Sequence, residues 1–284
     1  MHIDVNGTRL WFDVDGPGLV PDGATMRKRP TIVLVHGGPG GYDHSYFKPH
    51  FSRLTAVAQI VYLDLRGLGR SGRPDLTDWS LERCADDIAA FCEALGIDRP
   101  IVLGHSMGGF VALLHAIRHP DAIGGLVLIG TVGRWDVDRL EDGFRAVAGD
   151  RVAKLARRDF ESDETVTPDE SAEVAAAYGA NVPTADVLAR RIGNPHLGPI
   201  GWDLISRYDV VAELPSVTCP TLVVVGERDP VTPAAGAHEI IASLPPGVGH
   251  LVVLPGAGHF TWLDAPDGTF SAIESFVTKA WQAS

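Results

Sequence analysis

A pentapeptide of the form Gly-x-Ser-x-Gly constrains the fold of this chain more than any other feature. It reads Gly104-His-Ser-Met-Gly108 and directly follows a short apolar run, Ile101–Leu103. A helical pattern covers residues 110–119 and stops at Pro120. A serine on such a strand-to-helix turn takes a strained backbone conformation that lifts its hydroxyl into a cleft, and the glycines let strand and helix approach closely. We therefore predict that Ser106 is a nucleophile.

Two later apolar runs each end in a side chain that could activate this serine. Residues 221–225 are followed by Asp229, and residues 250–254 are followed by His259. A serine nucleophile needs a base, and the base needs an orienting acid. Because all three residues follow predicted strands, they should meet at the edge where an open α/β sheet builds its sites. We predict a Ser106, Asp229, His259 triad.

Four other residues compete for roles in this triad. Glu227 could be the acid, but it lies nearer the end of its strand. His250 precedes a strand instead of following one, and His105 adjoins the nucleophile, so its side chain should project away from the serine. His36 lies in a glycine loop, which we expect it to prop.

A glycine loop after the first central strand could help to stabilise an oxyanion. It reads His36-Gly-Gly-Pro-Gly-Gly41. The backbone N–H of Met107, directly after the nucleophile, is one predicted donor, and that of Gly38 is the second, with Gly37 as the neighbouring option. The loop lacks the Gly-Lys-Ser/Thr pairing and the glycine spacing of nucleotide-binding loops. We expect no metal and no cofactor.

The order of apolar and helical segments predicts one α/β domain with an insertion. Strands alternate with helices over residues 31–129 and again over 221–281, which is typical of a mostly parallel sheet. A hairpin over 2–5 and 9–14 should lie at an edge, and residues 16–30 should form a loop. We assign 1–133 and 212–284 to the core and 134–211 to a helical lid, which could instead be a fixed extra layer.

Charge and composition limit the partners. The net charge of −12 disfavours nucleic acid and anionic membrane surfaces. The N-terminus lacks the features of a signal peptide, no apolar run is long enough for a membrane span, and three cysteines without useful spacing fit a reducing cytoplasm. We expect a cytoplasmic monomer or homodimer that acts on a small molecule.

Three motifs together resemble one superfamily. His36-Gly-Gly-Pro-Gly40, Asp64-x-Arg-Gly-x-Gly-x-Ser71 and Gly104-x-Ser-x-Gly-Gly109 are similar to those of α/β-hydrolases of the proline iminopeptidase-like branch. The resemblance implies an eight-stranded, mostly parallel sheet with helices on both faces and a helical lid. The segment from Asp64 to Ser71 should serve turn geometry and internal ion pairing. Esterases, lactonases and C–C bond hydrolases reuse these motifs.

The expected reaction is therefore hydrolysis of a small carboxylic ester or lactone through an acyl-enzyme on Ser106. The alternative is an iminopeptidase-like N-terminal aminopeptidase, with a C–C bond hydrolase or lyase on the same triad as a third option. An aminopeptidase must hold an ammonium group with acids near its cleft. The residue after the predicted triad acid, which often helps in relatives, is Pro230. The acids available in the predicted lid are Glu161, Asp163, Glu164, Asp169, Glu170, Glu173, Asp203 and Glu213.

Overall fold

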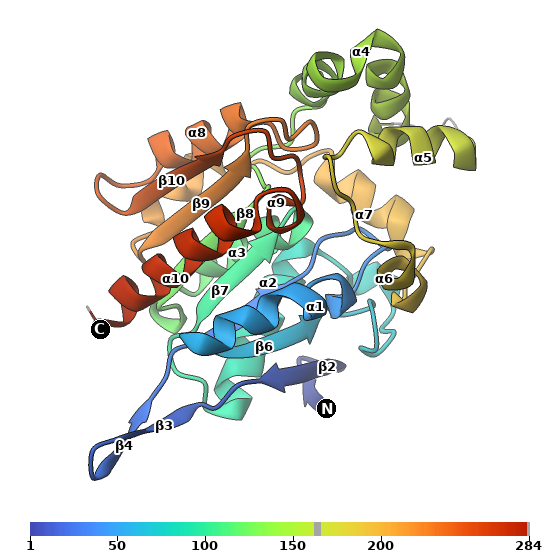
Figure 1. Cartoon of the computed structure of the whole chain (residues 1–284). Coiled ribbons are helices and arrows are strands. Elements are labelled where there is room, and N and C mark those ends of the chain that lie inside the picture. Colours follow the sequence, from blue (N-terminus) through green and yellow to red (C-terminus); the bar gives the residue numbers. More distant parts are fainter. Residues whose placement is uncertain (162–165, 283–284) are drawn as a thin grey trace.

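A computed structural model describes residues 1–161 and 166–282 and contains one central eight-stranded sheet (Figure 1). In chain order its strands are β1 (His2–Val5), β2 (Thr8–Asp15), β5 (Thr31–Val35), β6 (Gln59–Asp64), β7 (Ile101–His105), β8 (Gly125–Ile129), β9 (Thr221–Gly226) and β10 (Gly249–Leu254). They lie side by side in the order β1-β2-β6-β5-β7-β8-β9-β10. Each pair of neighbouring strands from β6 to β10 is parallel. At the other end of the sheet, β1 pairs antiparallel with β2, and β2 pairs antiparallel with β6. The predicted mostly parallel sheet is confirmed.

The central strands are apolar on both faces because helices cover both faces. In β5, Ile32 and Leu34 belong to one apolar layer, whereas Val33 and Val35 belong to the other. One layer is completed by α2 (Leu81–Leu95), α3 (Met107–Arg118) and α8 (Ala234–Ser243). The opposite layer is completed by η1 (His44–Tyr46), α1 (Lys48–Phe51), η2 (Ser52–Ala56), α9 (Thr261–Asp264) and α10 (Pro266–Gln282).

The register of the parallel strands brings their carboxyl ends together. His105 at the end of β7 pairs with Ile129, Ile129 pairs with Val224 of β9, and Leu254 at the end of β10 pairs with Gly226. The chain segments that leave β7, β8, β9 and β10 therefore emerge at one edge of the sheet. This edge is where a site can form.

The chain between β8 and β9 is helical, and we call residues 134–211 the helical insertion. Its helices are α4 (Val137–Glu161), α5 (Pro168–Ala176), α6 (Ala185–Arg190) and α7 (Leu197–Ile205), and η5 (Val211–Ser216) leads back to the sheet. In α4 the helical backbone breaks at Gly149, with φ 85°. The inner faces of α4 and α5 share a small apolar cluster that includes Phe144, Phe160 and Val174. No helix in the described residues is long and apolar enough to cross a membrane.

One local prediction is wrong. Residues 16–30, expected as a loop, contain a two-stranded hairpin of β3 (Leu19–Asp22) and β4 (Thr25–Lys28) that projects from the body (Figure 1). Nearly all of its side chains are exposed, so the sequence has no alternation of buried and exposed positions to mark the strands. The tight turn at Gly23, with φ 61°, was the remaining signal.

Candidate active site

Ser106 lies on a sharp turn between β7 and α3. Its φ of 55° and ψ of −127° are strained for a residue with a side chain. Two contacts to the end of β8 hold this conformation, because the Ser106 N–H donates to the Ile129 carbonyl (3.1 Å) and the Ser106 carbonyl accepts from the Thr131 hydroxyl (2.9 Å). The side chain remains partly exposed. The predicted elbow geometry is therefore present.

The glycines around Ser106 are required by close backbone contacts. A Cβ at Gly104 would lie 2.2 Å from the Gly108 carbonyl oxygen, and a Cβ at Gly108 would lie 2.2 Å from the Val35 carbonyl oxygen. Strand β7, helix α3 and the end of β5 therefore meet with no room for a methyl group. This contact explains why the pentapeptide has glycines at both ends.

The structure brings Asp229 and His259 into direct contact. Oδ2 of Asp229 lies 2.9 Å from Nδ1 of His259, and both side chains are buried. The other carboxylate oxygen accepts hydrogen bonds from the backbone amides of Val231 and Thr232, each at 2.9 Å. The Thr232 hydroxyl donates to Oδ2 at 2.7 Å. Four donors thus fix the carboxylate before any substrate binds.

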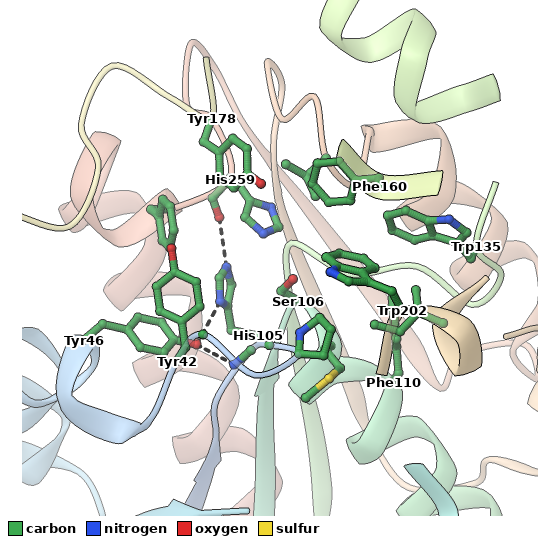
Figure 2. A pocket seen from close by; sticks show the side chains of 18 residues that line it. Tyr42, Tyr46, His105, Ser106, Phe110, Trp135, Phe160, Tyr178, Trp202 and His259 are labelled. Atoms are coloured by element: carbon green, nitrogen blue, oxygen red, sulfur yellow. Dashed lines mark hydrogen bonds between the residues drawn. The ribbon is translucent and has the colours of Figure 1, made fainter. Parts of the chain in front are cut away.

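The contact with Asp229 determines which nitrogen of His259 can act as a base. A carboxylate accepts only, so Nδ1 carries the proton and Nε2 is left with its lone pair. Ser106 and His259 line the same cavity (Figure 2). Gly130 lies against the Asp229–His259 pair. Its φ is 51°, and a Cβ there would lie 3.2 Å from both Asp229 Oδ2 and His259 Nδ1. Sequence reasoning did not select Gly130 or Thr232.

The competing residues lie elsewhere. Glu227 is exposed and accepts a hydrogen bond from the Gly256 amide (2.9 Å). His250 is exposed at the start of β10. His36 is fully buried, and its Nε2 accepts from the Leu65 amide (3.2 Å) while Nδ1 bonds the Gly37 carbonyl (2.7 Å). Burial lowers the pKa of His36, so this neutral imidazole props the glycine loop as expected.

The glycine loop leaves one of its two candidate amides free for an oxyanion. The Gly37 N–H donates to the Tyr46 hydroxyl at 2.7 Å, so it is already used. The amide of Gly38 has no acceptor among the described residues, and Gly38 lines the cavity with Ser106. Met107 is the first residue of α3, and its N–H therefore has no partner within the helix. Of the two predicted options, this geometry favours Gly38.

His105, the residue before Ser106, joins two loops of the site. It is buried, and its Nε2 lies 3.2 Å from the His259 carbonyl oxygen, so Nε2 donates. Nδ1 then accepts from the Tyr46 hydroxyl (3.0 Å), which in turn accepts from Gly37 (Figure 2). Burial lowers the pKa of His105 well below its usual value. A neutral imidazole thus connects the oxyanion loop to the loop that carries the base.

The cavity over Ser106 is small and aromatic. Its volume is about 130 Å³. Eight aromatic side chains from the core and the helical insertion line it: Tyr42, Tyr46, Phe110, Trp135, Phe160, Tyr178, Trp202 and Phe260 (Figure 2). None of the lining residues in the described part of the chain is Asp, Glu, Lys or Arg. The walls therefore favour a small, uncharged group.

None of the predicted acids whose side chains the structure describes lines this cavity. The side chains of Glu161, Asp163 and Glu164 lie outside the described residues, and the other five contact solvent, as Asp169, Glu170, Glu173, Asp203 and Glu213. One half-buried acid that the sequence did not single out is Asp159 of α4. Burial raises its pKa, and it accepts a hydrogen bond from the Ser171 hydroxyl (3.1 Å).

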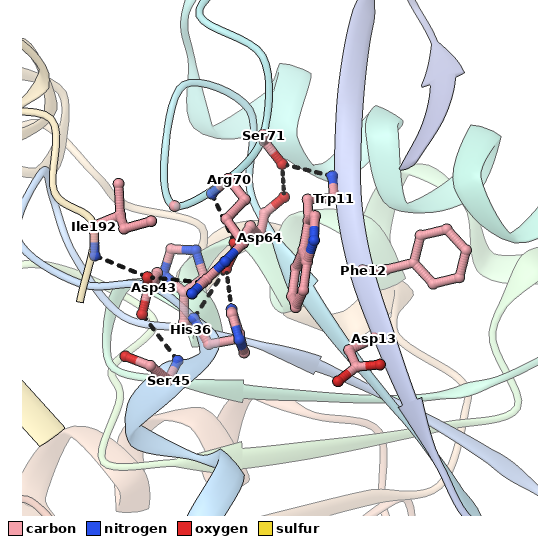
Figure 3. Close-up of polar contacts among 12 residues, drawn as sticks. Trp11, Phe12, Asp13, His36, Asp43, Ser45, Asp64, Arg70, Ser71 and Ile192 are labelled. Carbon is pink, nitrogen blue, oxygen red and sulfur yellow. Dashed lines mark hydrogen bonds and ion pairs between the residues drawn. The ribbon is translucent and has the colours of Figure 1, made fainter. Parts of the chain in front are cut away.

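A buried carboxylate cluster beside the site is the one group of side chains, among those the structure describes, that could hold a metal ion. Ligand atoms of Asp43, His44 and Asp64 lie within 4.8 Å of one another (Figure 3). Hydrogen-bond donors already reach all four carboxylate oxygens, from Ser45, Ile192, His44 and Arg70. The hydrogen atoms of these N–H donors therefore occupy the positions around the carboxylate oxygens that a cation would need. The cluster therefore has a structural role: through the hydrogen bond from the Ile192 amide to Asp43, it attaches the helical insertion to the core.

The segment that follows β6 also contains a buried ion pair. Arg66 donates to both oxygens of Asp87 in α2, at 2.6 and 2.7 Å, and both side chains are buried. The predicted internal ion pairing of this segment is confirmed.

Comparison with known proteins relates this architecture to hydrolases. Residues 30–266 match the family described as the alpha/beta hydrolase fold. The chain is 30% identical over 266 residues to a monoacylglycerol lipase of Mycolicibacterium smegmatis, covering 90% of this chain and 87% of that protein. It is 25% identical over 300 residues to a proline iminopeptidase of Heyndrickxia coagulans, covering 98% of each. The crystal structure of a proline iminopeptidase from Mycobacterium smegmatis superimposes with a TM-score of 0.80 and 23% identity, covering 100% and 99%.

Proposed function

Because the chain belongs to the alpha/beta hydrolase fold family, it is a hydrolase, and we propose that it is a serine hydrolase of small, neutral carboxylic esters or lactones. The observation that carries this proposal is one small cavity lined by Ser106 and His259, without a charged wall among the described residues. Similarity to a monoacylglycerol lipase supports ester cleavage.

The proposed mechanism uses side chains and backbone amides of the site. The Ser106 hydroxyl attacks the carbonyl carbon while Nε2 of His259 takes its proton, and Asp229 stabilises the imidazolium that forms. The amides of Gly38 and Met107 donate to the oxyanion. His259 then protonates the departing alcohol, leaving an acyl-enzyme. A water molecule, activated by the same nitrogen, releases the acid and restores Ser106.

The size of the cavity limits the acyl group. A cavity of about 130 Å³ is close to the roughly 150 Å³ that holds one benzene molecule. We therefore expect acyl groups up to about the size of butyryl or benzoyl to fit, and long acyl chains to react slowly. The aromatic walls favour an apolar group, since burial of a carboxylate or ammonium without a partner is costly.

Cleavage of an N-terminal proline is the second candidate function. The similarity to a proline iminopeptidase and the motif from His36 to Gly40 favour it. An ammonium group has three N–H donors that need acceptors. Burial raises the pKa of the cavity residue Tyr178, and the charge of the half-buried Asp159 adds to this effect, so Asp159 is an acid that could supply one. Loss of anilide cleavage in Asp159→Asn would support this candidate.

The test compares wild type with Ser106→Ala on p-nitrophenyl acetate, butyrate and octanoate, on γ-butyrolactone, and on proline p-nitroanilide. We expect ester or lactone turnover that falls with chain length and drops at least about 10³-fold in Ser106→Ala. Circular dichroism checks that the variant is folded. Turnover that survives in Ser106→Ala would refute the nucleophile. Cleavage of the anilide with inert esters would transfer the proposal to the aminopeptidase.

A further inference from the structure

The loop that carries His259 is bonded to the helical insertion. The His259 N–H donates to the carbonyl of Tyr178, which follows α5, at 2.6 Å. The Gly258 N–H donates to Oδ2 of Asp264 in α9 at 2.8 Å. The other oxygen of Asp264 accepts from the backbone N–H (2.7 Å) and the side-chain amide (3.0 Å) of Asn181. One carboxylate therefore bridges the base loop and the insertion.

We call residues 178–181 of the insertion the 178–181 clasp. The backbone of the clasp touches the backbone of the loop that carries His259. A Cβ at Gly258 would lie 2.1 Å from the Tyr178 carbonyl oxygen and 2.5 Å from the Cα of Gly179. A Cβ at Gly179 would lie 2.5 Å from Oδ2 of Asp264. Glycine on both sides is what allows the approach. The contact is therefore built into the sequence of both segments.

The clasp and the core hold the same histidine from opposite sides. The His259 carbonyl accepts from His105 of the core, whereas its N–H donates to the clasp. The Tyr178 ring packs edge-on to the His259 imidazole at 5.6 Å and also lines the cavity. A substrate in the cavity would therefore touch the segment that positions the base.

We propose that Asp264 is a positioning residue that couples the seating of the helical insertion to the placement of the general base. The inference rests on the proposed function, because it assigns His259 that role. With the clasp seated, the backbone of residues 258–259 is fixed, and His259 is held in the cavity that Ser106 also lines. When the clasp lifts, the His259 amide loses its acceptor, and a displacement of about 1 Å can slow such a reaction about 10²-fold. The insertion thereby acts as a lid whose closure completes the site.

A matched pair of variants tests the coupling without any substrate. Asp264→Ala removes both halves of the bridge. Glu227→Ala removes a hydrogen bond of the same loop, to the Gly256 amide, in which no residue of 178–181 takes part. Amide hydrogen exchange should rise at least about tenfold in both 178–181 and 256–259 for Asp264→Ala, and in 256–259 alone for Glu227→Ala. Unchanged exchange of 178–181 in Asp264→Ala would overturn the proposal.

Kinetics separate a positioning role from a general loss of stability. With p-nitrophenyl acetate we expect kcat of Asp264→Ala to fall about tenfold with KM within about twofold of wild type. The kcat of Asp264→Asn, which keeps one acceptor oxygen, should lie between that of Asp264→Ala and that of wild type. An equal loss of kcat in Glu227→Ala would overturn the proposal. If wild-type turnover does not depend on Ser106, the proposed function fails, and the exchange experiment still decides the coupling.

Discussion

Removing the hydroxyl of Tyr46 tests whether the hydrogen-bonded chain through His105 supports the site. This hydroxyl accepts from the Gly37 amide at 2.7 Å and donates to Nδ1 of His105 at 3.0 Å. The side chain is 3% exposed. In Tyr46→Phe the ring keeps its packing, including the stacked contact with Phe47 at 4.4 Å. The substitution therefore deletes two hydrogen bonds and creates only a minimal cavity.

The expected cost follows from the two groups left without a partner. A buried donor or acceptor that loses its partner costs about 1–3 kcal/mol, so the Gly37 amide and the His105 nitrogen together cost about 2–6 kcal/mol. At about 2 °C per kcal/mol for a chain of this size, Tm should fall by at least about 4 °C. Because Gly37 adjoins the proposed oxyanion donor Gly38, we also expect kcat to fall about tenfold.

Tyr208→Phe is the matched control, because it makes the same chemical change in another buried tyrosine. The Tyr208 hydroxyl is buried, and within the described residues it has no hydrogen-bond partner. Its ring stacks on Phe110 at 4.4 Å and stays in place. Thermal unfolding followed by circular dichroism should show no loss, or a small gain, for this control. The reasoning is refuted if Tyr46→Phe and Tyr208→Phe unfold within about 1 °C of each other.

Two further predictions concern stability. Burial lowers the pKa of His115 to about 4, so between pH 6.5 and 4 the unfolded chain binds the proton that the folded chain excludes. The free energy of unfolding should therefore fall by up to about 3 kcal/mol as the pH drops through this window. Urea unfolding at several pH values should show that the free energy of unfolding of His115→Gln depends less steeply on pH than that of wild type. Gly104→Ala should prevent soluble expression because its Cβ meets the Gly108 carbonyl, whereas Gly198→Ala, in open space within α7, should raise Tm slightly. Equal soluble yields of the two glycine variants would contradict the steric argument.

The sequence pattern was sufficient for the parts of the fold that depend on periodicity. The central strands are apolar on both faces, and the candidate residues follow them, so the pattern could predict that Ser106, Asp229 and His259 gather at one edge. Their chemical roles stay predictions. The choice between Asp229 and Glu227 depended on the turn after β9. In this turn the backbone amides of Val231 and Thr232 donate hydrogen bonds to the carboxylate of Asp229 and not to that of Glu227.

Contacts between distant segments could not be predicted from this sequence. Tyr46 and His105 are 59 residues apart, and Asn181 and Asp264 are 83 apart, so no local pattern joins either pair. The hairpin of β3 and β4 escaped for a different reason. It pairs through its backbone and buries almost no side chain, so its residues carry no periodic signal.

The fastening of Ile192 by the buried carboxylate cluster has a consequence for directed evolution of this scaffold. The Asp43 carboxylate holds the Ile192 amide at 2.9 Å, and two residues later the Asn194 amide donates to the Gly40 carbonyl at 2.7 Å. A combinatorial library that varies Trp135 and Trp202 would reshape the cavity wall while these anchors keep the insertion in register. Randomising Gly193 and Asn194 instead would loosen this wall in most of the library, because a Cβ at Gly193 would lie 2.8 Å from the Gly40 carbonyl oxygen and the Asn194 side-chain amide donates to the Gly67 carbonyl at 2.9 Å.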